Sequence, residues 1–557
     1  MSKNYSNQIN ILASKASKAI QLGNLAEAKE CYIKLKRLLP NHPGIYDALG
    51  VLSIQLGVFD DAIQFFNDSL KILPNQPIVL FNQAIAYKQL NFFDKALICY
   101  DRAIQLKPDY FEAYFNQANL LNELNFYDEA IVSYQRAAQF QPNFFAIYVN
   151  WGNTLRSLKR YDEALDSYDR AIQLKPDDFA PHNGKGNTLH ELKRYDEALT
   201  AYDRAIQLKP DDFAPHNGKG NTLQDIKRYD EALTAYDRAI QLKPDSAKSY
   251  WNKSLLKLLH GEFEEGWKLY EWRRQNEDFK KNYKFYDSPL WLGKESLHNK
   301  TLLVESEQGL GDIIQFCRYI PMLLKLNARV ILETPKTLTS IIKTITGNFL
   351  VLEKGQALTN FDYHIPIMSL PFAFKTTIHN IPTSVPYLFS DKTKKEYWNK
   401  KLGKKTQPRI GLVWSGSASH KNDKNRTIPL KDLEPIVKLP FEFHSLQKEI
   451  REYDQTTLFE FKQIHQHQNE LNDFADTAAL IEEMDLIISV DTSVAHLAGA
   501  LGKDIYILLA YHPDYRWLLN RKDSPWYPTC TLFRNSKNDD WSDVVLEIKS
   551  NLQNTLI

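Results

Sequence analysis

Residues 179–212, FAPHNGKGNTLHELKRYDEALTAYDRAIQLKPDD, are followed directly by residues 213–246, FAPHNGKGNTLQDIKRYDEALTAYDRAIQLKPDS. The two segments are nearly identical, and their offset of 34 residues is the period of a two-helix repeat. In both directions a small residue recurs at this spacing, followed by an aromatic residue four positions later and by a proline near the end of the unit. The small residues are Ala28, Ala62, Ala96, Ala130, Ala164, Ala198, Ala232 and Gly266; the aromatic residues are Tyr32, Phe66, Tyr100, Tyr134, Tyr168, Tyr202, Tyr236 and Tyr270; the prolines are Pro40, Pro74, Pro108, Pro142, Pro176, Pro210 and Pro244. We predict eight units between residues 9 and 280, the last without the proline.

The recurring residues have a packing role. Alanine lets two helices approach closely, the aromatic ring fills the gap between neighbouring helix pairs, and proline ends the second helix because it lacks the N–H donor. Each pair buries its apolar face only against the next pair, which gives a solenoid with a concave surface. The pattern resembles the tetratricopeptide repeat (TPR) and covers about half the chain, so we expect an all-α TPR superhelix over residues 1–280.

Asparagine recurs on the first helices of these units, and helix propensity does not explain it. An asparagine amide carries both a donor and an acceptor, which match the main chain of an extended peptide. The ladder resembles that of the TPR superhelix of eukaryotic O-GlcNAc transferase, which implies a peptide-binding groove. The alternative is that Gly-Asn is only the local consensus of this array, amplified by duplication. The residues are Asn82, Asn116, Asn150 and Asn252 at the sixth place of the unit, and Asn119, Asn153, Asn187 and Asn221 at the ninth.

The composition excludes several classes of protein. The chain has 557 residues and a formal net charge of +1, so it has neither a nucleic-acid-binding tail nor a polybasic membrane patch. The four cysteines are scattered without metal-type spacing, which indicates reduced thiols in a cytosolic protein. The start, MSKNYSNQIN, has no apolar segment typical of a signal peptide, and no uncharged apolar run approaches the roughly 18 residues of a membrane span. We expect a cytoplasmic protein without a membrane span.

Residues 281–300, KNYKFYDSPLWLGKESLHNK, break the repeat. The segment contains the aromatic residues Tyr283, Phe285, Tyr286 and Trp291 and is poor in glycine and serine, so we predict a packed connector rather than a loose tether.

From Thr301 the pattern changes to an alternation of strands and helices, which implies parallel sheets covered by helices. We predict two Rossmann-like halves facing a cleft, residues 301–390 and residues 391–557, the second ending in an amphipathic helix. The predicted strands are 301–305, 329–333 and 361–365 in the first half and 409–414, 441–446, 486–490 and 504–510 in the second; the predicted helices are 312–326, 474–483 and 541–553.

Four of these strands run into polar turns at their carboxyl ends, where open α/β sheets bind ligands. The first turn holds Gly309, Gly311 and Asp312; the second holds His420, Lys421, Lys424 and Arg426; the third is Gln447–Lys448; the fourth holds Asp491, Thr492, Ser493 and His496 and opens a helix. Basic residues on two turns and a helix N-terminus on another favour an anionic ligand.

Simpler roles exist for several of these residues. Asp312 could be only a helix cap, His496 a core or capping histidine, and Lys421 and Lys424 a solvated loop face. Asp491 would repel bound phosphates unless it holds hydroxyl groups, as the acidic residue of the Rossmann ribose contact does.

The segments GLGDIIQF, GLVWSGSASHKNDKNRTIP and SVDTSVAHLAGALG resemble glycosyltransferase family 9, the lipopolysaccharide heptosyltransferases, over residues 300–535. The resemblance implies a GT-B fold, with two Rossmann-like domains of which the second binds a nucleotide-sugar without a metal. It places the catalytic base at Asp312, the basic residue before a proline turn at Arg426, and the donor motif at Asp491, Thr492, Ser493 and His496. Ser493 replaces the usual glycine, the first half is short, and the proline after the Gly-Asp motif is displaced to Pro321. Together with the TPRs, the chain resembles bacterial TPR–glycosyltransferase fusions.

The implied function is a metal-independent, inverting transfer of sugar from a nucleotide-sugar, the co-substrate, to a protein or peptide in the TPR groove. Asp312 would accept the acceptor proton, and the helix after Asp491 would stabilise the leaving diphosphate together with Gly311, Arg426 and Lys448. Two alternatives remain open: a TPR scaffold with a non-catalytic transferase-like domain, and a transferase for glycan or lipid-linked acceptors whose TPRs recruit other proteins.

Overall fold

The structure is a computed structural model that describes residues 3–280, 284, 286–357, 360–418, 420, 422–537 and 540–556. The chain divides into two compact units, residues 1–226 and residues 227–557.

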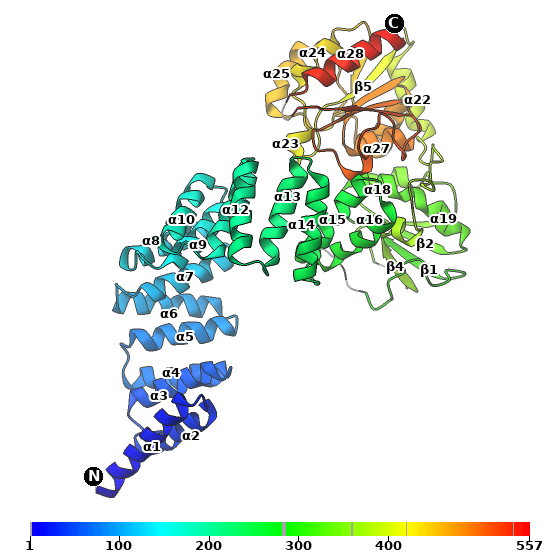
Figure 1. Cartoon of the computed structure of the whole chain (residues 1–557). Helices are drawn as coiled ribbons and strands as arrows, with labels where there is room; N and C mark the ends of the chain where they lie inside the picture. The colour runs from blue at the N-terminus through cyan, green and yellow to red at the C-terminus, as the bar shows by residue number, and fades with distance from the viewer. Residues whose placement is uncertain are drawn as a thin grey trace. The chain divides into compact units, whose positions relative to one another are not determined.

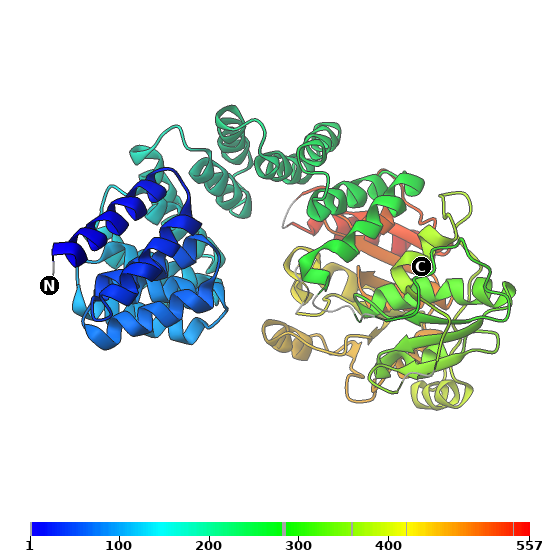
Figure 2. The ribbon, with the colours of Figure 1, turned by 90° about the horizontal axis from the view of Figure 1, so that it is seen from below.

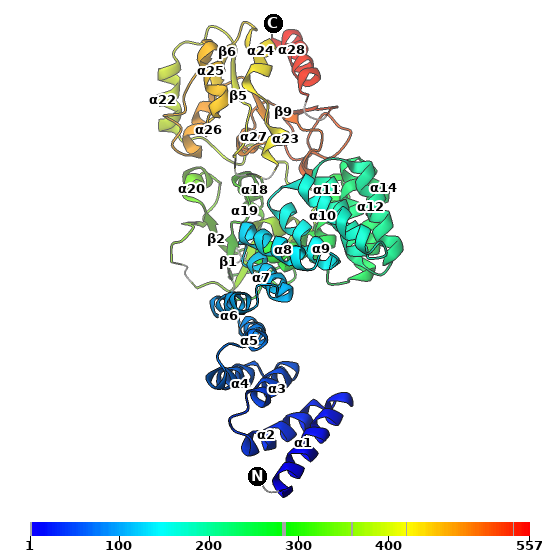
Figure 3. The same cartoon turned by 90° about the vertical axis from the view of Figure 1, so that its left-hand side faces the viewer.

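The first unit is all-α, as the repeat pattern predicts. Its helices pair as antiparallel neighbours and stack along the chain (Figures 1 and 3), and Figure 2 shows the stack from below. The helices are α1 Lys3–Gln21, α2 Leu25–Leu38, α3 Pro43–Gln55, α4 Phe59–Ile72, α5 Pro77–Gln89, α6 Phe93–Leu106, α7 Phe111–Glu123, α8 Tyr127–Phe140, α9 Phe145–Ser157, α10 Tyr161–Leu174, α11 Phe179–Glu191, α12 Tyr195–Leu208 and α13 Phe213–Asp225.

One aromatic ring shows how the period packs. Tyr168 of α10 is fully buried between glycines of the flanking first helices. A Cβ atom would come within 2.8 Å of its Cε1 atom at Gly152 of α9 and within 2.4 Å at Gly184 of α11. Glycine at these positions therefore makes room for the ring, which explains why this poor helix former recurs inside helices.

The turn inside each unit requires a left-handed backbone. Asn91, Asn125, Lys159 and Lys193 occupy the same place in successive units, and φ lies between 60° and 65° at all four. Asparagine and glycine adopt this conformation at little cost, so the lysines are the less expected residues there.

The second unit contains the last repeat helices and two parallel sheets. The repeat helices are α14 Tyr229–Leu242, α15 Ala247–Leu259 and α16 Phe263–Tyr270, followed by η1 Glu271–Gln275 and α17 Glu277–Lys280. The first sheet has the order β3-β2-β1-β4, and the second has the order β10-β9-β8-β5-β6-β7. Every strand pair in both sheets is parallel. This confirms the predicted α/β region with parallel sheets.

The first sheet and its helices comprise β1 Thr301–Glu305, α18 Leu310–Phe316, η2 Cys317–Tyr319, α19 Ile320–Lys325, β2 Arg329–Thr334, α20 Lys336–Ile342, β3 Leu350–Glu353, β4 Tyr363–Pro366, η3 Ile367–Ser369 and α21 Leu370–Ala373. β1 lies in the middle, with Val304 in register with Leu332 of β2 and Ile365 of β4.

The second sheet follows α22 Lys392–Leu402 and comprises β5 Arg409–Val413, α23 Asp423–Arg426, η4 Leu430–Leu433, α24 Glu434–Val437, β6 Glu442–Ser445, α25 Glu452–Glu460, β7 Ile464–His465, α26 Phe474–Glu482, β8 Leu486–Val490, α27 Ser493–Ala500, β9 Ile505–Leu509, η5 Tyr515–Trp517, β10 Cys530–Arg534 and α28 Ser542–Leu556. β5 and β8 are buried along their whole length, as expected for central strands of a parallel sheet covered on both faces.

Two details differ from the sequence prediction. The helix predicted over 312–326 is broken by the 3-10 turn at 317–319, because Pro321 cannot donate the N–H that a continuous helix needs and instead sits at the start of α19. The strands β3, β7 and β10 were not predicted, since they are short or carry no clear alternation of apolar and polar residues.

The last repeat packs on the α/β part, so the second compact unit begins at Lys227 although the period continues to Lys280. The Trp267 ring of α16 contacts Phe316 of α18 and Tyr515 of η5 edge-on, with centroids 6.0 and 5.8 Å apart. In the connector, the Trp291 N–H donates to the carbonyl of His364 in β4 at 2.9 Å. Tyr283 and Phe285 lie outside the described residues.

A buried arginine joins the end of the repeats to the loop after β1. The Arg273 guanidinium donates from Nη1 to Glu271, from Nη2 to Ser369 and from Nε and Nη2 to Glu307, with a shortest distance of 2.5 Å. Glu307 also accepts the Met368 N–H at 3.0 Å. This network holds the 306–312 loop, which carries the predicted site residues, against the last repeat.

Replacing Arg273 by methionine should therefore destabilise the second unit by about 3 kcal/mol, because Glu307 would stay buried without its partner. The free energy of unfolding in urea, followed by tryptophan fluorescence, measures the effect. Arg274→Met is the matched control, since Arg274 has no ion pair among the described residues. Equal losses in the two variants would contradict the assignment.

Candidate functional site

The N-terminal ends of α18 and α27 meet at the carboxyl ends of β1 and β8. Gly311 makes this contact possible, because a Cβ atom there would lie 2.9 Å from the His496 Cδ2 atom and 3.5 Å from the Ser493 Cα atom. The first sheet and the second sheet thus bring the polar turns predicted at 306–312 and 491–496 together.

Asp312 occupies the first turn of α18 and faces the second sheet. Its Oδ2 atom accepts the Gly309 N–H at 2.7 Å, so the carboxylate does cap its helix. Its Oδ1 atom accepts a hydrogen bond from Nη2 of Arg516. Burial raises the pKa of Asp312, and the Arg516 charge and the Gly309 N–H oppose that rise.

Arg516 is the centre of this group, and sequence reasoning missed it. Its Nε donates to Gln315 of α18 at 2.7 Å, and its Nη1 donates to Asp514 at 2.7 Å. The signal was present, because the segment YHPDYRW follows the apolar strand β9 just as the other polar turns follow theirs. Since carboxyl ends of parallel strands share one edge, that turn belongs with the others.

Asp491 and His496 lie at the start of α27. The His496 Nδ1 atom hydrogen-bonds the Tyr527 hydroxyl at 2.9 Å, the ring stacks on Trp517, and Nε2 lies 3.8 Å from the Asp491 Oδ1 atom. Burial lowers the pKa of His496 well below its usual value, which keeps the imidazole neutral. Burial, assisted by the Asp514 charge, raises the pKa of Asp491 to about 6.

Arg426 of α23 reaches the same place from the loop after β5. Its Nη1 donates to the Asp491 carbonyl at 3.0 Å. Its guanidinium lies over Gly416, where a Cβ atom would come within 2.3 Å of Nη2. The Asp423 Oδ1 atom lies 3.5 Å from its Nε without a hydrogen bond, and Arg451 binds the Oδ2 atom of the same carboxylate at 2.6 Å.

Thr492 and Ser493 place the helix N-terminus beside these groups. Thr492 is the N-cap of α27, but its hydroxyl does not cap the helix and instead lies 3.2 Å from the Ser489 hydroxyl. Ser493 is the first helical residue. The positive end of the α27 dipole is therefore next to Arg426 and Asp491.

The two residues of the third polar turn, Gln447 and Lys448, bond main-chain groups. Lys448 is exposed, and its ammonium donates to the Gln468 carbonyl beyond β7 at 2.9 Å rather than to the group around Asp491. Gln447 instead accepts the main-chain N–H groups of Trp414 and Ser415, at 3.3 and 3.2 Å, and so holds the start of the loop that leads to Arg426.

The other residues of the loop after β5 differ in their surroundings. Lys424 is exposed, and Lys421 lies outside the described residues. The pKa of His420 is lowered by burial and by the charge of Arg426 and is raised by the charges of Asp423, Asp312 and Asp514.

The ninth-place asparagines have partners inside the solenoid. Each of three accepts a tyrosine hydroxyl through its amide oxygen, while its nitrogen makes no bond to that tyrosine: Asn119 from Tyr134 at 2.7 Å, Asn153 from Tyr168 at 2.8 Å and Asn187 from Tyr202 at 2.9 Å. The donor Nδ2 is thereby oriented by the tyrosine. The sequence predicted the recurrence but not this partner.

The sixth-place asparagines behave differently. Asn116 donates to the Glu112 carbonyl of its own helix at 2.8 Å, and Asn150 donates to the Asn119 amide oxygen at 2.9 Å. Asn82 is half-buried on α5, and the ninth-place Asn221 is likewise half-buried on α13. The predicted ladder thus mixes side chains bonded within one helix with side chains bonded between neighbouring units.

The side chains of Asp312, Arg426, Asp491 and Arg516, together with the start of α27, can bind an anion and exchange a proton. They combine a helix N-terminus and two arginines with two carboxylates whose pKa values are raised by burial. Within the described residues, no three His, Cys, Asp or Glu side chains are grouped as a metal site. In the same part of the chain, no helix has the length and hydropathy needed to cross a bilayer.

Replacing Gly311 by alanine should cost about 1–3 kcal/mol of stability, because His496 is held by Tyr527 and Trp517 and cannot move away from the new methyl group. Thermal unfolding checks this. Gly309→Ala is the matched control, since its Cβ would meet only the Asp312 Oδ2 atom at 3.2 Å. A Gly311→Ala protein as stable as the control would contradict the close approach of the two helices.

Comparison with known families identifies the repeats. Family models described as tetratricopeptide repeat match residues 81–143, 149–213 and 214–246. A curated protein, Protein FlbA of Caulobacter vibrioides (strain ATCC 19089 / CIP 103742 / CB 15), is 24% identical over 333 residues. The aligned region is 54% of this chain and 54% of FlbA, so the chain spans about half the length of that relative.

Solved structures of TPR proteins are similar to the repeat region. The crystal structure of YrrB, described as a TPR protein with an unusual peptide-binding site, is 24% identical with a TM-score of 0.30 and covers 34% of this chain and 98% of its own. A tetratricopeptide repeat protein from Parabacteroides merdae ATCC 43184 is 16% identical with a TM-score of 0.37 and covers 45% of this chain and 99% of its own. The family models, rather than these structures, show that the N-terminal part of the chain contains tetratricopeptide repeats.

Proposed function

We propose that the chain is a glycosyltransferase of the GT-B type that moves a sugar from a nucleotide-sugar to a protein or peptide selected by its TPRs. One observation carries the proposal: the first turn of α18, which holds Asp312, packs against the first turn of α27 at Gly311, and Arg426 is bonded to the Asp491 carbonyl just before α27. A place for an anion and a place for a proton acceptor are thus adjacent, and each is contributed by a different sheet.

The donor half of the proposal rests on positive groups. Arg426 has one nitrogen on the Asp491 carbonyl and a buried Nε without a hydrogen bond, and the α27 N-terminus lies beside it. In the proposed reaction these groups bind the diphosphate and stabilise the charge that develops when it leaves, so the transfer is metal-independent. Lys448 is not part of this assignment, because its ammonium is bonded to the Gln468 carbonyl.

The carboxylates take two roles. Asp312 accepts the proton of the acceptor hydroxyl as that oxygen attacks the anomeric carbon from the face opposite the diphosphate, which inverts the configuration. The carbon–oxygen bond to the diphosphate breaks, and the diphosphate leaves with the electron pair. Asp491, which is close to His496, binds hydroxyl groups of the donor. Arg516 orients Asp312, and its charge opposes the rise in the pKa of Asp312 that burial causes.

The acceptor half rests on the repeats. Tetratricopeptide repeats support a protein-interaction role, and the oriented Nδ2 donors of Asn119, Asn153 and Asn187 suit the carbonyl groups of an extended chain. The proposal therefore places a peptide segment of the acceptor along the first helices of the units.

Asp312→Asn should lower transfer by about a hundredfold to ten-thousandfold, because the amide cannot accept the proton. Transfer is measured by mass spectrometry after incubation with a panel of nucleotide-sugars and lysate proteins. The rise in melting temperature with nucleoside diphosphates should remain, since the variant keeps the α27 side of the site. Asp504→Asn, at an exposed residue directly before β9, is the control. Full transfer by Asp312→Asn would remove this base assignment.

Asn153→Ala should weaken acceptor binding more than Tyr168→Phe does, because Tyr168→Phe removes only the hydroxyl that orients the amide and leaves the amide itself. Fluorescence anisotropy with a labelled acceptor peptide, once identified, measures the affinity, and thermal unfolding measures the stability lost in each variant. If the asparagine is purely structural, both variants lose similar stability and neither changes acceptor affinity.

A TPR scaffold with a non-catalytic α/β part is the second candidate. The observation that favours it is that both carboxylate oxygens of Asp312 already accept hydrogen bonds, one from Gly309 and one from Arg516. A scaffold predicts no transfer from any nucleotide-sugar and no rise in melting temperature with nucleoside diphosphates. A glycan or lipid-linked acceptor would instead give transfer to a product that is not a protein.

A further inference from the structure

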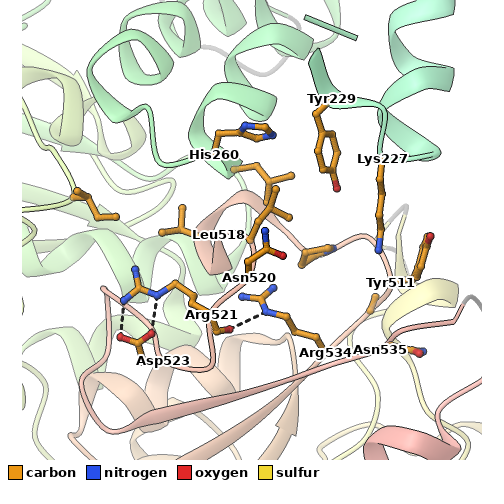
Figure 4. A pocket seen from close by; sticks show the side chains of 15 residues that line it. Lys227, Tyr229, His260, Tyr511, Leu518, Asn520, Arg521, Asp523, Arg534 and Asn535 are labelled. Carbon is orange, nitrogen blue, oxygen red and sulfur yellow. Dashed lines mark hydrogen bonds and ion pairs between the residues drawn. The ribbon is translucent and has the colours of Figure 1, made fainter. Parts of the chain in front are cut away.

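A cavity of about 690 Å³ lies inside the second unit, between the last repeats and the second sheet (Figure 4). Lys227 and His260 line it from turns of the last repeats, Tyr511 and Asn520 line it from the segment after β9, and Arg534 lines it from the end of β10. Its volume is that of a typical small-ligand site.

The cavity carries positive charge that the protein does not neutralise. Asp523 is bound by Arg521 through two hydrogen bonds of 2.8 and 2.5 Å. This leaves Lys227 and Arg534, neither of which pairs with a carboxylate among the described residues. Figure 4 shows Lys227 extending down from the repeat side of the cavity and Arg534 lying below it, with its guanidinium turned toward Arg521.

Two main-chain carbonyl groups hold the Arg534 guanidinium in place. Its Nε donates to the Arg521 carbonyl at 2.9 Å, and its Nη2 donates to the Trp517 carbonyl at 2.6 Å. Its Nη1 has no hydrogen-bond partner in the part of the chain that the structure describes. Burial and then the Arg521 charge lower the pKa of Arg534.

Lys227 meets the cavity from the left-handed turn before α14, where φ is 61°. Its ammonium lies 3.3 Å from the centroid of the Tyr511 ring. Burial and then the Arg534 charge lower the pKa of Lys227. Two cations that repel each other across a cavity are stabilised when an anion binds between them.

The rest of the lining is aromatic and apolar. Tyr229 and His260 contact each other edge-on at 5.1 Å, and Ile378 and Leu518 complete this side. Such walls bind the organic part of a ligand while the cations bind its charged group.

We propose that this cavity binds a small phosphate ester, with Lys227 and Arg534 holding its phosphate or pyrophosphate group. The site differs from the one proposed for the donor. That site uses β1, β5 and β8, whereas this cavity lies at the ends of β9 and β10. Segment 511–520 separates the two: Asp514 and Arg516 face Asp312, and Pro513 and Leu518 face the cavity. A ligand here thus contacts both the last repeats and the segment that positions Arg516.

Lysine footprinting tests the site with inorganic pyrophosphate as the probe. The full-length protein is treated with acetic anhydride with and without pyrophosphate, and the modified lysines are quantified by mass spectrometry. We expect pyrophosphate to protect Lys227 severalfold and to leave Lys159 unchanged. Lys159 is the matched control, because it occupies the same turn of an earlier unit at a φ of 60°. Equal modification of Lys227 with and without pyrophosphate would overturn the proposal.

A variant supplies the second measurement. Lys227→Asn should weaken pyrophosphate binding, measured by calorimetry, at least about tenfold, because one charged hydrogen-bond partner is lost. The Lys227→Asn variant should keep its fold, since asparagine occupies the corresponding turn position at Asn91 and Asn125. Lys159→Asn should bind as the unmodified protein does. Unchanged affinity in Lys227→Asn, or protection of Lys227 by a phosphopeptide but not by pyrophosphate, would contradict a small phosphate ester as the ligand.

Discussion

The whole candidate site depends on the hydrogen bonds that the Arg516 guanidinium donates. One guanidinium group bonds Asp312 and Gln315 of α18 on one side and Asp514 of its own loop on the other. A planar group with several fixed donors is suited to this work, because each bond restricts the others. Without it, the carboxylate of Asp312 would be buried with only the Gly309 N–H, and the two sheets would lack a charged link at the point where their ligand edges meet.

A second arginine, Arg318, also links the two sheets, but it does so without a carboxylate partner among the described residues. Arg318 is buried and bonds the carbonyl groups of Pro382 and Trp526 and the hydroxyl of Tyr387, while its guanidinium lies over the rings of Tyr387, Trp526 and Tyr527. No carboxylate pairs with it among the described residues, so aromatic faces and carbonyl dipoles stabilise the charge. Because Tyr527 also bonds His496, this packing fixes the imidazole that Gly311 approaches.

The sequence was most informative where a pattern reflects one local cause. The 34-residue period predicted the helical repeats, because proline and the small and aromatic residues act within one unit and its neighbour. The apolar runs with polar ends predicted most strands of both parallel sheets and placed Asp312, Arg426 and Asp491 after the carboxyl ends of strands. It could not decide what the polar groups bond. The carboxylate of Asp312 is shared with an arginine 204 positions later, and Lys448 turns toward Gln468, and no local pattern encodes such distant partners.

The near-identity of residues 179–212 and 213–246 bears on how such an array changes in evolution. The unit after them departs from the consensus, with Gly266, Trp267 and no terminal proline, because its second helix packs on Phe316 and Tyr515 instead of on another repeat. Whole units can therefore be gained or lost upstream without altering the contact between the last repeat and the α/β part. The reach of the array would then vary in fixed increments between related chains, while the geometry next to the α/β part stays the same.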